Sequence, residues 1–189
     1  HHRGPDAVGR WVAPDRRMFL GHTRLSIIGL DNGGQPMSDA SGDVLLVVNG
    51  EFYGYQAIRE RLRAEGCQFK TDSDSEIALH LYLREAMNLG RHLRGEFAAV
   101  IADRRNDAMF AIRDRFGIKP LFYTVHEGDV FFASEIKALL ALGVPARWNR
   151  EAVLQECFHF RPHSRSIFAG IYTVPPGHYA IAQRGEVSV

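Results

Sequence analysis

Polar residues that can bind or stabilise charge stand at the ends of apolar stretches in the first half of this sequence. Arg24 lies toward the end of an expected strand, and Asn49-Gly50 directly follows the apolar run Val44 to Val48. An Asn side-chain amide and a Gly backbone N–H can both donate to a developing oxyanion, and glycine lets a substrate approach closely. Taken alone, however, an Asn-Gly pair is more often an ordinary turn. A lone Arg24 is likewise more often a strand-edge side chain that reaches solvent.

Acidic residues gather near the expected start of a helix at Ser73. Ser73 followed by Glu76 matches a capping box. Asp74 falls in the first turn, where a carboxylate favours the helix dipole whether or not it binds a ligand. The acidic spacing of Asp72, Asp74 and Glu76 lacks the glycine and the distant glutamate of a calcium loop, which excludes that site.

The sequence offers no credible thiol nucleophile and no metal site. Cys67 follows a helix-ending glycine, where a small half-buried residue is the expected occupant, and Cys157 is predicted to lie in the core on a helix face. Neither has a histidine or a free amine placed beside it by the sequence. His159 and His163 are four residues apart, but the proline between them argues against a shared helical face.

The elements that must position these residues follow the order strands, two helices, strands, helices and a closing hairpin, which predicts an α+β domain. Strands are expected at Arg10 to Ala13, Met18 to Ile28, Val44 to Val48, Phe97 to Ala102, Ala108 to Arg113, Leu121 to Val125, Val130 to Phe132, Tyr179 to Ala182 and Val187 to Val189. Helices are expected at Tyr55 to Glu65, from about Ser73, at Glu135 to Leu142 and at Arg150 to Phe158. His1 to Gly9 and Asp31 to Asp43 are expected to be irregular, and the chain to turn at Asn49-Gly50. The unbroken apolar run before that turn predicts a central strand covered on both faces.

Seven segments in order resemble the N-terminal glutaminase domain of the asparagine synthetase family, a class II glutamine amidotransferase domain. They are His2 to Asp6, Gly21 to Ile28, Gln35 to Met37, Asn49 to Tyr53, Ser73 to Glu76, Arg113 to Leu121 and Ser134 to Leu139. The match runs from His2 to about Gly177, nearly the whole chain. The resemblance implies an αββα four-layer sandwich of the N-terminal-nucleophile hydrolase type, in which two stacked, mainly antiparallel sheets are flanked by helices.

The resemblance also implies an activity and a set of site residues. In this family a processed N-terminal cysteine attacks the side-chain amide of glutamine, with its own α-amine as the base, and the released ammonia passes to a domain that activates a carboxylate with ATP and Mg²⁺. The residues that correspond are Arg24 for the α-carboxylate of glutamine, Leu25, Ile27 and Ile28 for backbone contacts, Asn49 and Gly50 for the oxyanion hole, and Glu51 and Asp74 for the ammonium group. The tract Arg113 to Leu121 is expected to shape the domain without a catalytic step. No cofactor or metal is expected in this domain itself.

Bulk composition agrees with one globular domain over residues 1–189. Hydrophobic residues make up 46% and charged residues 24% of the 189 positions. The formal net charge of +1 and the scattered arginines point to neither nucleic acid nor a membrane surface. No apolar run reaches the ~18 residues of a membrane helix, and two cysteines are too few for a disulfide framework, so a cytoplasmic location is expected.

Three hypotheses follow for the function. The first is an active glutaminase, part of an asparagine synthase (glutamine-hydrolysing)-like ligase, whose N-terminal strand and cysteine precede this chain, so that the fragment alone is inactive and a synthetase domain follows residue 189. The second is an inactive pseudo-amidotransferase scaffold, as in β-lactam-synthetase-like proteins, and the third is a free-standing binding module. The joint presence of Arg24, Asn49, Gly50, Glu51 and Asp74 favours the first. The ammonia acceptor, a homodimeric state and the effect of Gly54, where synthetases commonly have Asn, stay open.

Overall fold

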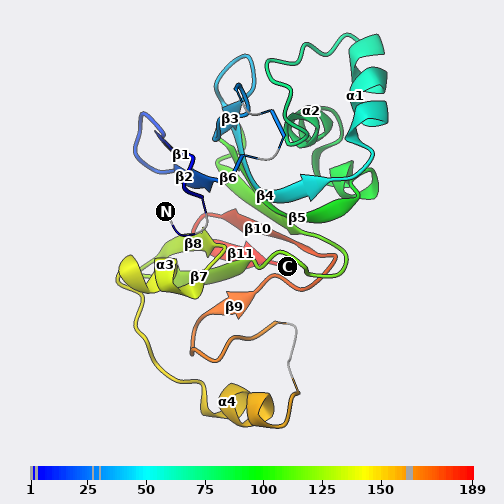
Figure 1. Ribbon diagram of the computed structural model, residues 1–189. Coiled ribbons are helices and arrows are strands. Elements are labelled where there is room, and N and C mark those ends of the chain that lie inside the picture. The colour runs from blue at the N-terminus through cyan, green and yellow to red at the C-terminus, as the bar shows by residue number, and fades with distance from the viewer. Residues whose placement is uncertain (1, 3, 27, 30, 161–163) are drawn as a thin grey trace.

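The computed structural model describes residues 2, 4–26, 28–29, 31–160 and 164–189, and these form four layers (Figure 1). A helical layer covers one face of a six-stranded sheet, smaller sheets cover its other face, and a short helix packs on the outside of one of them. All of the strand pairs are antiparallel. The prediction of two stacked antiparallel sheets flanked by helices is confirmed.

The six-stranded sheet has the order β11-β10-β6-β5-β4-β3 and forms the centre of the molecule. Its strands are β3 (Met37–Ser38), β4 (Val44–Phe52), β5 (Gly95–Asp103), β6 (Ala108–Arg113), β10 (Tyr179–Gln183) and β11 (Glu186–Ser188). In β4 the side chains of Val44, Leu46 and Val48 pack toward the helices, whereas Leu45 and Val47 pack toward the opposite sheets. The prediction that both faces of this run are covered is therefore confirmed, and it explains why the run has no polar alternation.

The helical layer consists of α1 (Tyr55–Ala64) and α2 (Glu76–Glu85), which is followed by the 3₁₀ helix η1 (Ala86–Arg91). The capping box predicted at Ser73 is wrong, because α2 begins at Glu76 with Ser75 as its N-cap and has no side-chain cap bond. The Glu76 carboxylate instead accepts hydrogen bonds from the backbone N–H groups of Lys70 and Thr71, each at 2.7 Å. Glu76 thus fixes the loop before α2, and this loop carries Asp74.

The opposite face of the central sheet is covered by two smaller sheets. One is the hairpin of β1 (Ala7–Val12) and β2 (Phe19–Arg24), and the other has the order β8-β7-β9, formed by β7 (Phe122–His126), β8 (Asp129–Ala133) and β9 (Tyr172–Thr173). The helix α3 (Ile136–Ala141) packs on the three-stranded sheet through the fully buried Leu139. The short strands β3 and β9 lie in segments with no strand pattern, and β1 begins inside the stretch expected to be irregular.

The helix α4 (Arg150–Cys157) projects away from these layers (Figure 1). Ala152 is its one buried residue. The prediction that Cys157 lies in the core is wrong, because its side chain is exposed and the adjacent Phe158 is 81% exposed. Apolar residues on a helix with little to pack against cannot be distinguished by sequence from a core-facing stripe.

The turn predicted at Asn49-Gly50 is also wrong, because β4 continues through both residues to Phe52. Gly50 pairs with Phe97 and Glu51 with Glu96 on β5. Gly50 has a φ of 130°, and a Cβ atom there would lie 1.9 Å from the carbonyl oxygen of Glu96. The glycine is needed because β5 approaches too closely for a side chain, and not because the chain reverses.

Candidate active site

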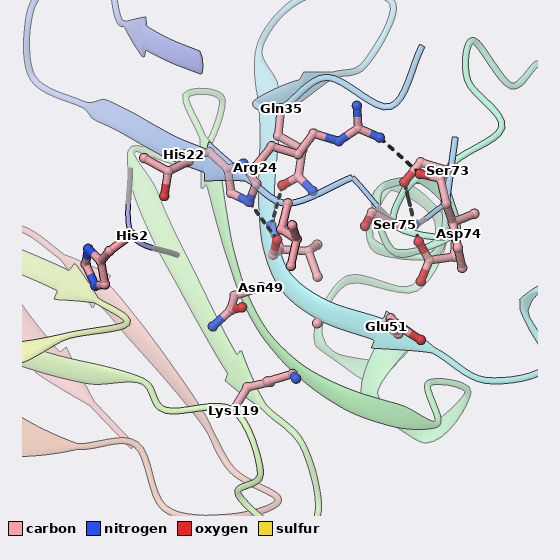
Figure 2. A pocket seen from close by; sticks show the side chains of 15 residues that line it. His2, His22, Arg24, Gln35, Asn49, Glu51, Ser73, Asp74, Ser75 and Lys119 are labelled. Atoms are coloured by element: carbon pink, nitrogen blue, oxygen red, sulfur yellow. Dashed lines mark hydrogen bonds between the residues drawn. The ribbon is translucent and has the colours of Figure 1, made fainter. Parts of the chain in front are cut away.

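A cavity of about 360 Å³ opens between the end of β2, the middle of β4 and the loop before α2 (Figure 2). It is lined by His2, His22, Thr23, Arg24, Leu25, Ile28, Gln35, Val48, Asn49, Gly50, Glu51, Ser73, Asp74, Ser75 and Lys119. Every predicted site residue that the structure describes is in this set, and the predicted Ile27 lies outside the described residues. The volume of the cavity is in the range of small-molecule sites.

Asp74 is a buried carboxylate in this cavity, with 4% of its surface exposed. Its Oδ2 accepts a hydrogen bond of 2.7 Å from the backbone N–H of Phe52, and its Oδ1 accepts a longer one of 3.4 Å from the Ser73 hydroxyl. Among the residues that the structure describes, no cationic side chain forms an ion pair with it. A buried carboxylate is ordinarily paired with a cation or saturated with hydrogen bonds. Within the described chain, Asp74 has only one short hydrogen bond and no cation, so the cavity is suited to a ligand that brings a positive group.

Arg24 supplies the opposite charge to the same cavity. It is 9% exposed, so it does not extend into solvent as a strand-edge arginine would. Its Nη2 donates to the carbonyl oxygens of Ile28 at 3.0 Å and Gly29 at 2.6 Å. Gly33 makes room for it, since a Cβ atom there would lie 2.4 Å from Nη2. A planar guanidinium held in place by its own loop is well suited to a carboxylate ligand.

Asn49 and Gly50 lie in the middle of the part of β4 that lines the cavity, between Val48 and Glu51. The amide nitrogen of Asn49 is buried and has no hydrogen-bond partner within the described part of the chain. A buried polar group without a partner is costly and calls for an explanation. A side-chain donor that is not satisfied by the protein is what a site for a carbonyl oxygen or an oxyanion requires.

His22 on β2 and Gln35 before β3 are among the cavity residues that the sequence did not predict as site residues. His22 Nε2 lies 3.0 Å from the carbonyl oxygen of Val48, and Gln35 Oε1 accepts the backbone N–H of Val48 at 2.6 Å. Burial lowers the pKa of His22 below its ordinary value; the bond to Val48 opposes this shift, and the charge of Arg24 adds to it. Both residues lie within segments quoted for the family resemblance, which was the available signal.

Lys119 is a further missed residue, and the segment Arg113 to Leu121 brings it to the cavity. Asp114 is fully buried and its two carboxylate oxygens accept the backbone N–H groups of Phe116, Ile118 and Lys119, each at 3.0 Å. Lys119 lines the cavity, and its Nζ lies 3.3 Å from Glu96 Oε2. The tract expected only to shape the domain therefore also places a cation at the site.

Neither cysteine belongs to this cavity. Cys67 packs beside the helical core and Cys157 is exposed on α4. Within the described ranges there is no group of three or more His, Cys, Asp or Glu side chains that could hold a metal ion. No described helix is long and apolar enough to cross a membrane.

The family model described as "Glutamine amidotransferase domain" matches residues 1–189. The chain belongs to this family. Among curated relatives of this amidotransferase domain, an amidase, chry2, of Gibberella zeae is 43% identical over 98% of the chain. Asparagine synthetase [glutamine-hydrolyzing] 1 of Bacillus subtilis is 38% identical over 99% of it. The chain spans 27% and 30% of the length of these two relatives. It is thus a glutamine amidotransferase domain of the kind found in asparagine-synthetase-like proteins.

The fold of this amidotransferase domain also matches solved structures. The glutamine phosphoribosylpyrophosphate amidotransferase of B. subtilis superposes with a TM-score of 0.66 at 23% identity, over 90% of this chain and 34% of its own. At this identity the likeness concerns the fold alone. It agrees with the layers described above, and the predicted αββα sandwich is confirmed.

Proposed function

We propose that this domain binds L-glutamine in the cavity of Figure 2 and hydrolyses it to glutamate and ammonia within an asparagine-synthetase-like enzyme. The observation that carries the proposal is that two buried groups of opposite charge line one cavity. Asp74 is a carboxylate without a cationic side-chain partner in the described residues, and Arg24 supplies a guanidinium. An α-amino acid carries an ammonium group that Asp74 can bind and a carboxylate that Arg24 can bind. The family membership favours glutamine as that amino acid.

The roles proposed for the cavity residues follow from their chemistry. Arg24 binds the α-carboxylate, with the backbone of Leu25 and Ile28 beside it, and Asp74 binds the α-ammonium together with Glu51. This leaves the side-chain amide of glutamine for Asn49 and Gly50. Their N–H groups stabilise the oxyanion that forms when a nucleophile adds to the amide carbon.

The proposed nucleophile is an N-terminal cysteine outside residues 1–189, because neither Cys67 nor Cys157 lines the cavity. Its thiolate adds to the amide carbon, and its α-amine takes the thiol proton and returns it to the leaving nitrogen. Collapse of the oxyanion releases ammonia and leaves a thioester, which water cleaves to glutamate. The chain covers under a third of its relatives' length, which supports a further domain that uses ATP and Mg²⁺ to amidate a carboxylate with this ammonia.

The test measures glutamate released from L-glutamine by the full-length protein. Arg24→Ala is expected to lower kcat/KM by roughly 100-fold or more, because it leaves the substrate carboxylate without its charged partner. The matched control is Arg17→Ala, since Arg17 pairs with Asp107 on the exposed surface. A diazoketone analogue of glutamine should add one label to the N-terminal cysteine by intact mass and none to Cys67 or Cys157.

The inactive scaffold is the competing function, and the same experiment separates the two. Glutamine binding without glutamate release, together with no cysteine at the processed N-terminus, would favour the scaffold. Specific labelling of Cys67 or Cys157 would show that the nucleophile is wrongly assigned.

A further inference from the structure

The edge of β4 that faces the cavity is only partly covered by a neighbouring strand. On one side β5 pairs with β4 along its whole length, from Val44 to Phe52. On the other side β3 pairs only with Leu45 and Leu46. Val48 lies two residues beyond Leu46, so its N–H and C=O point to the same edge as those of Leu46, where no strand partner follows in the described chain.

Two side chains take the place of the missing strand at Val48. Gln35 Oε1 accepts its N–H at 2.6 Å, and His22 Nε2 lies 3.0 Å from its carbonyl oxygen (Figure 2). Because a carbonyl oxygen can only accept, Nε2 must carry the proton and act as donor. Burial lowers the pKa of His22, which favours the neutral ring with its single proton on that nitrogen.

Both side chains come from rigid surroundings. His22 lies within β2, opposite Gly9 on β1. A Cβ atom at Gly9 would lie 1.7 Å from the carbonyl oxygen of Gln35, so the backbone of Gln35 packs directly against β1. Val48 is therefore held by His22, which lies on the hairpin of β1 and β2, and by Gln35, which packs against that hairpin.

Satisfying Val48 with side chains instead of a strand keeps the cavity open. A further strand along this edge would occupy the space that His22, Gln35 and Asn49 line. A buried backbone pair with no partner would be costly. The hydrogen bonds of Val48 with Gln35 and His22 meet this need and leave the next residues of β4 accessible to a ligand.

The geometry points to Gln35 and His22 as positioning residues that hold the Val48 peptide so that Asn49 and Gly50 meet the oxyanion. The inference rests on the proposed function. Val48 directly precedes Asn49, and the alternation of a strand turns the N–H of Gly50 to the same edge as that of Val48. A small rotation of the Val48 peptide would displace both donors, and displacements of about 1 Å can cost on the order of 100-fold in rate.

The kinetic test compares Gln35→Met, which removes the acceptor, with Gln35→Glu, which keeps it, in the full-length protein. Gln35→Met should lower kcat for glutamine hydrolysis roughly 10- to 100-fold while KM changes less than about 3-fold, because oxyanion donors act in the transition state. Gln35→Glu should recover most of kcat. His22→Leu and His22→Gln form the equivalent pair for the donor.

The control variant is Gln183→Met, which removes a glutamine that donates to the carbonyl oxygen of Asn106 on the exposed surface. It should leave both constants unchanged. If Gln35→Met raised KM with kcat intact, or left both constants intact, Gln35 would not position the oxyanion donors and the inference would be overturned.

A second readout does not depend on activity, so a failure of the proposed function can be distinguished from a failure of the positioning role of Gln35. Hydrogen exchange of the Val48 amide should be slow in the wild-type protein, faster by 10-fold or more in Gln35→Met, on the order expected for loss of a hydrogen bond, and slow again in Gln35→Glu. If the wild-type protein does not release glutamate but this pattern holds, Gln35 does hold the Val48 peptide and the glutaminase proposal is wrong. Unchanged exchange in Gln35→Met would show that Gln35 does not hold the Val48 peptide, and the inference would be overturned.

Discussion

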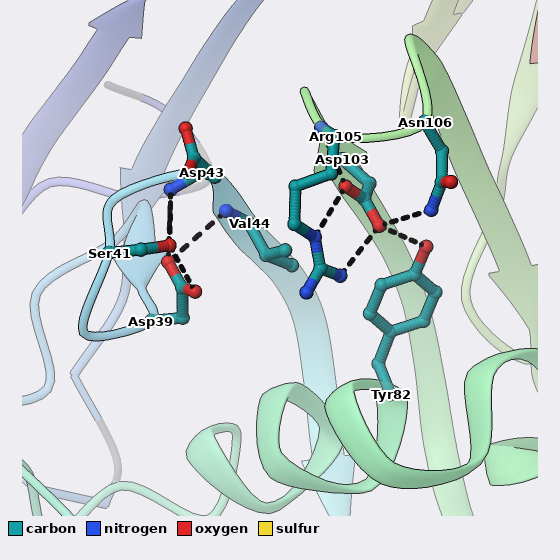
Figure 3. A network of polar contacts seen from close by, with 8 residues as sticks. All are labelled: Asp39, Ser41, Asp43, Val44, Tyr82, Asp103, Arg105 and Asn106. Carbon is teal, nitrogen blue, oxygen red and sulfur yellow. Dashed lines mark hydrogen bonds and ion pairs between the residues drawn. The ribbon is translucent and has the colours of Figure 1, made fainter.

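Asp74 and Asp103 are both buried carboxylates, but they differ in how much of their hydrogen-bonding capacity the protein uses. Asp103 ends β5, is fully buried, and accepts from Arg105 at 2.8 to 3.0 Å and from Tyr82 and Asn106 at 2.9 Å (Figure 3). Asp74 accepts one short bond from a backbone N–H and one long bond from a hydroxyl. Burial alone therefore does not mark a functional acid; unused acceptor capacity beside a cavity does.

The surroundings of Asp103 support a structural role. Burial disfavours its ionised form, but the bonds from Arg105, Tyr82 and Asn106 outweigh burial and lower the pKa of Asp103. Nearby in Figure 3, Asp39 accepts the N–H groups of Asp43 and Val44 at the start of β4. Such saturated carboxylates stabilise turns and strand ends, and their loss should affect folding rather than turnover.

The largest effect that tests this contrast is expected for Asp74→Asn. The amide oxygen can still accept the N–H of Phe52, but the negative charge for the substrate ammonium is lost. Unpairing a buried charge costs about 3 to 5 kcal/mol, or roughly 100- to 5,000-fold in kcat/KM for glutamine. Steady-state kinetics of the full-length protein measure it. A change of less than 3-fold would contradict the assignment of Asp74 to the ammonium group.

Glu76→Gln should reduce stability in a pH-dependent way. Burial disfavours the ionised form of Glu76, yet hydrogen bonds from His80, Lys70 and Thr71 lower its pKa from 4.5 to about 2. The ionised carboxylate thus stabilises the fold above pH 4.5, and this contribution is lost as the pH falls toward 2. The variant should be less stable by about 3 kcal/mol at pH 7, with the difference vanishing near pH 2. Urea unfolding over this pH range measures it, and a constant difference would contradict it.

Asp103→Asn should destabilise the fold by about 2 kcal/mol, because Arg105 and Tyr82 lose a charged partner. In contrast to Asp74→Asn, KM and kcat of the folded protein should not change. Thermal unfolding and glutamine kinetics on the same sample test both statements. A selective loss of turnover without loss of stability would remove the distinction between the two carboxylates.

The smallest effect is expected for Arg17→Ala. Arg17 pairs with Asp107 at 2.7 Å, but both side chains are largely exposed. Exposed ion pairs contribute about 0 to 1 kcal/mol, so unfolding in moderate salt should change by less than about 0.5 kcal/mol. A larger change would indicate that surface pairs, and not only saturated buried groups, hold this fold.

Sequence patterns predicted what depends on local order. The unbroken run in β4 correctly indicated a strand covered on both faces, and the helix expected at Tyr55 to Glu65 agrees with α1 at its start and to within one residue at its end. The turn at Asn49-Gly50 failed because the close approach of β5, far along the chain, overrides a local turn signal.

The site was predicted as a set of residues brought together from distant segments, and the family motifs made that possible. The roles of three cavity residues were not predicted, because these roles depend on contacts that sequence spacing does not encode. The three are His22, Gln35 and Lys119. Gln35 bonds to a residue 13 positions away and His22 to one 26 positions away. No local pattern distinguishes such a glutamine from one on the surface.

The close approach of β4 and β5 at Gly50 has a consequence for how evolution can be traced in such domains. The approach is reciprocal: a Cβ atom at Gly50 would meet Glu96 O at 1.9 Å, and one at Gly95 would meet Glu51 O at 2.0 Å. Selection for folding alone would therefore retain both glycines in a descendant that had ceased to hydrolyse glutamine. The persistence of Gly50 in such a lineage would thus give no evidence of activity. Asp74 could be replaced by Asn, which keeps the hydrogen bond to the Phe52 N–H and loses only the charge that the proposed substrate needs.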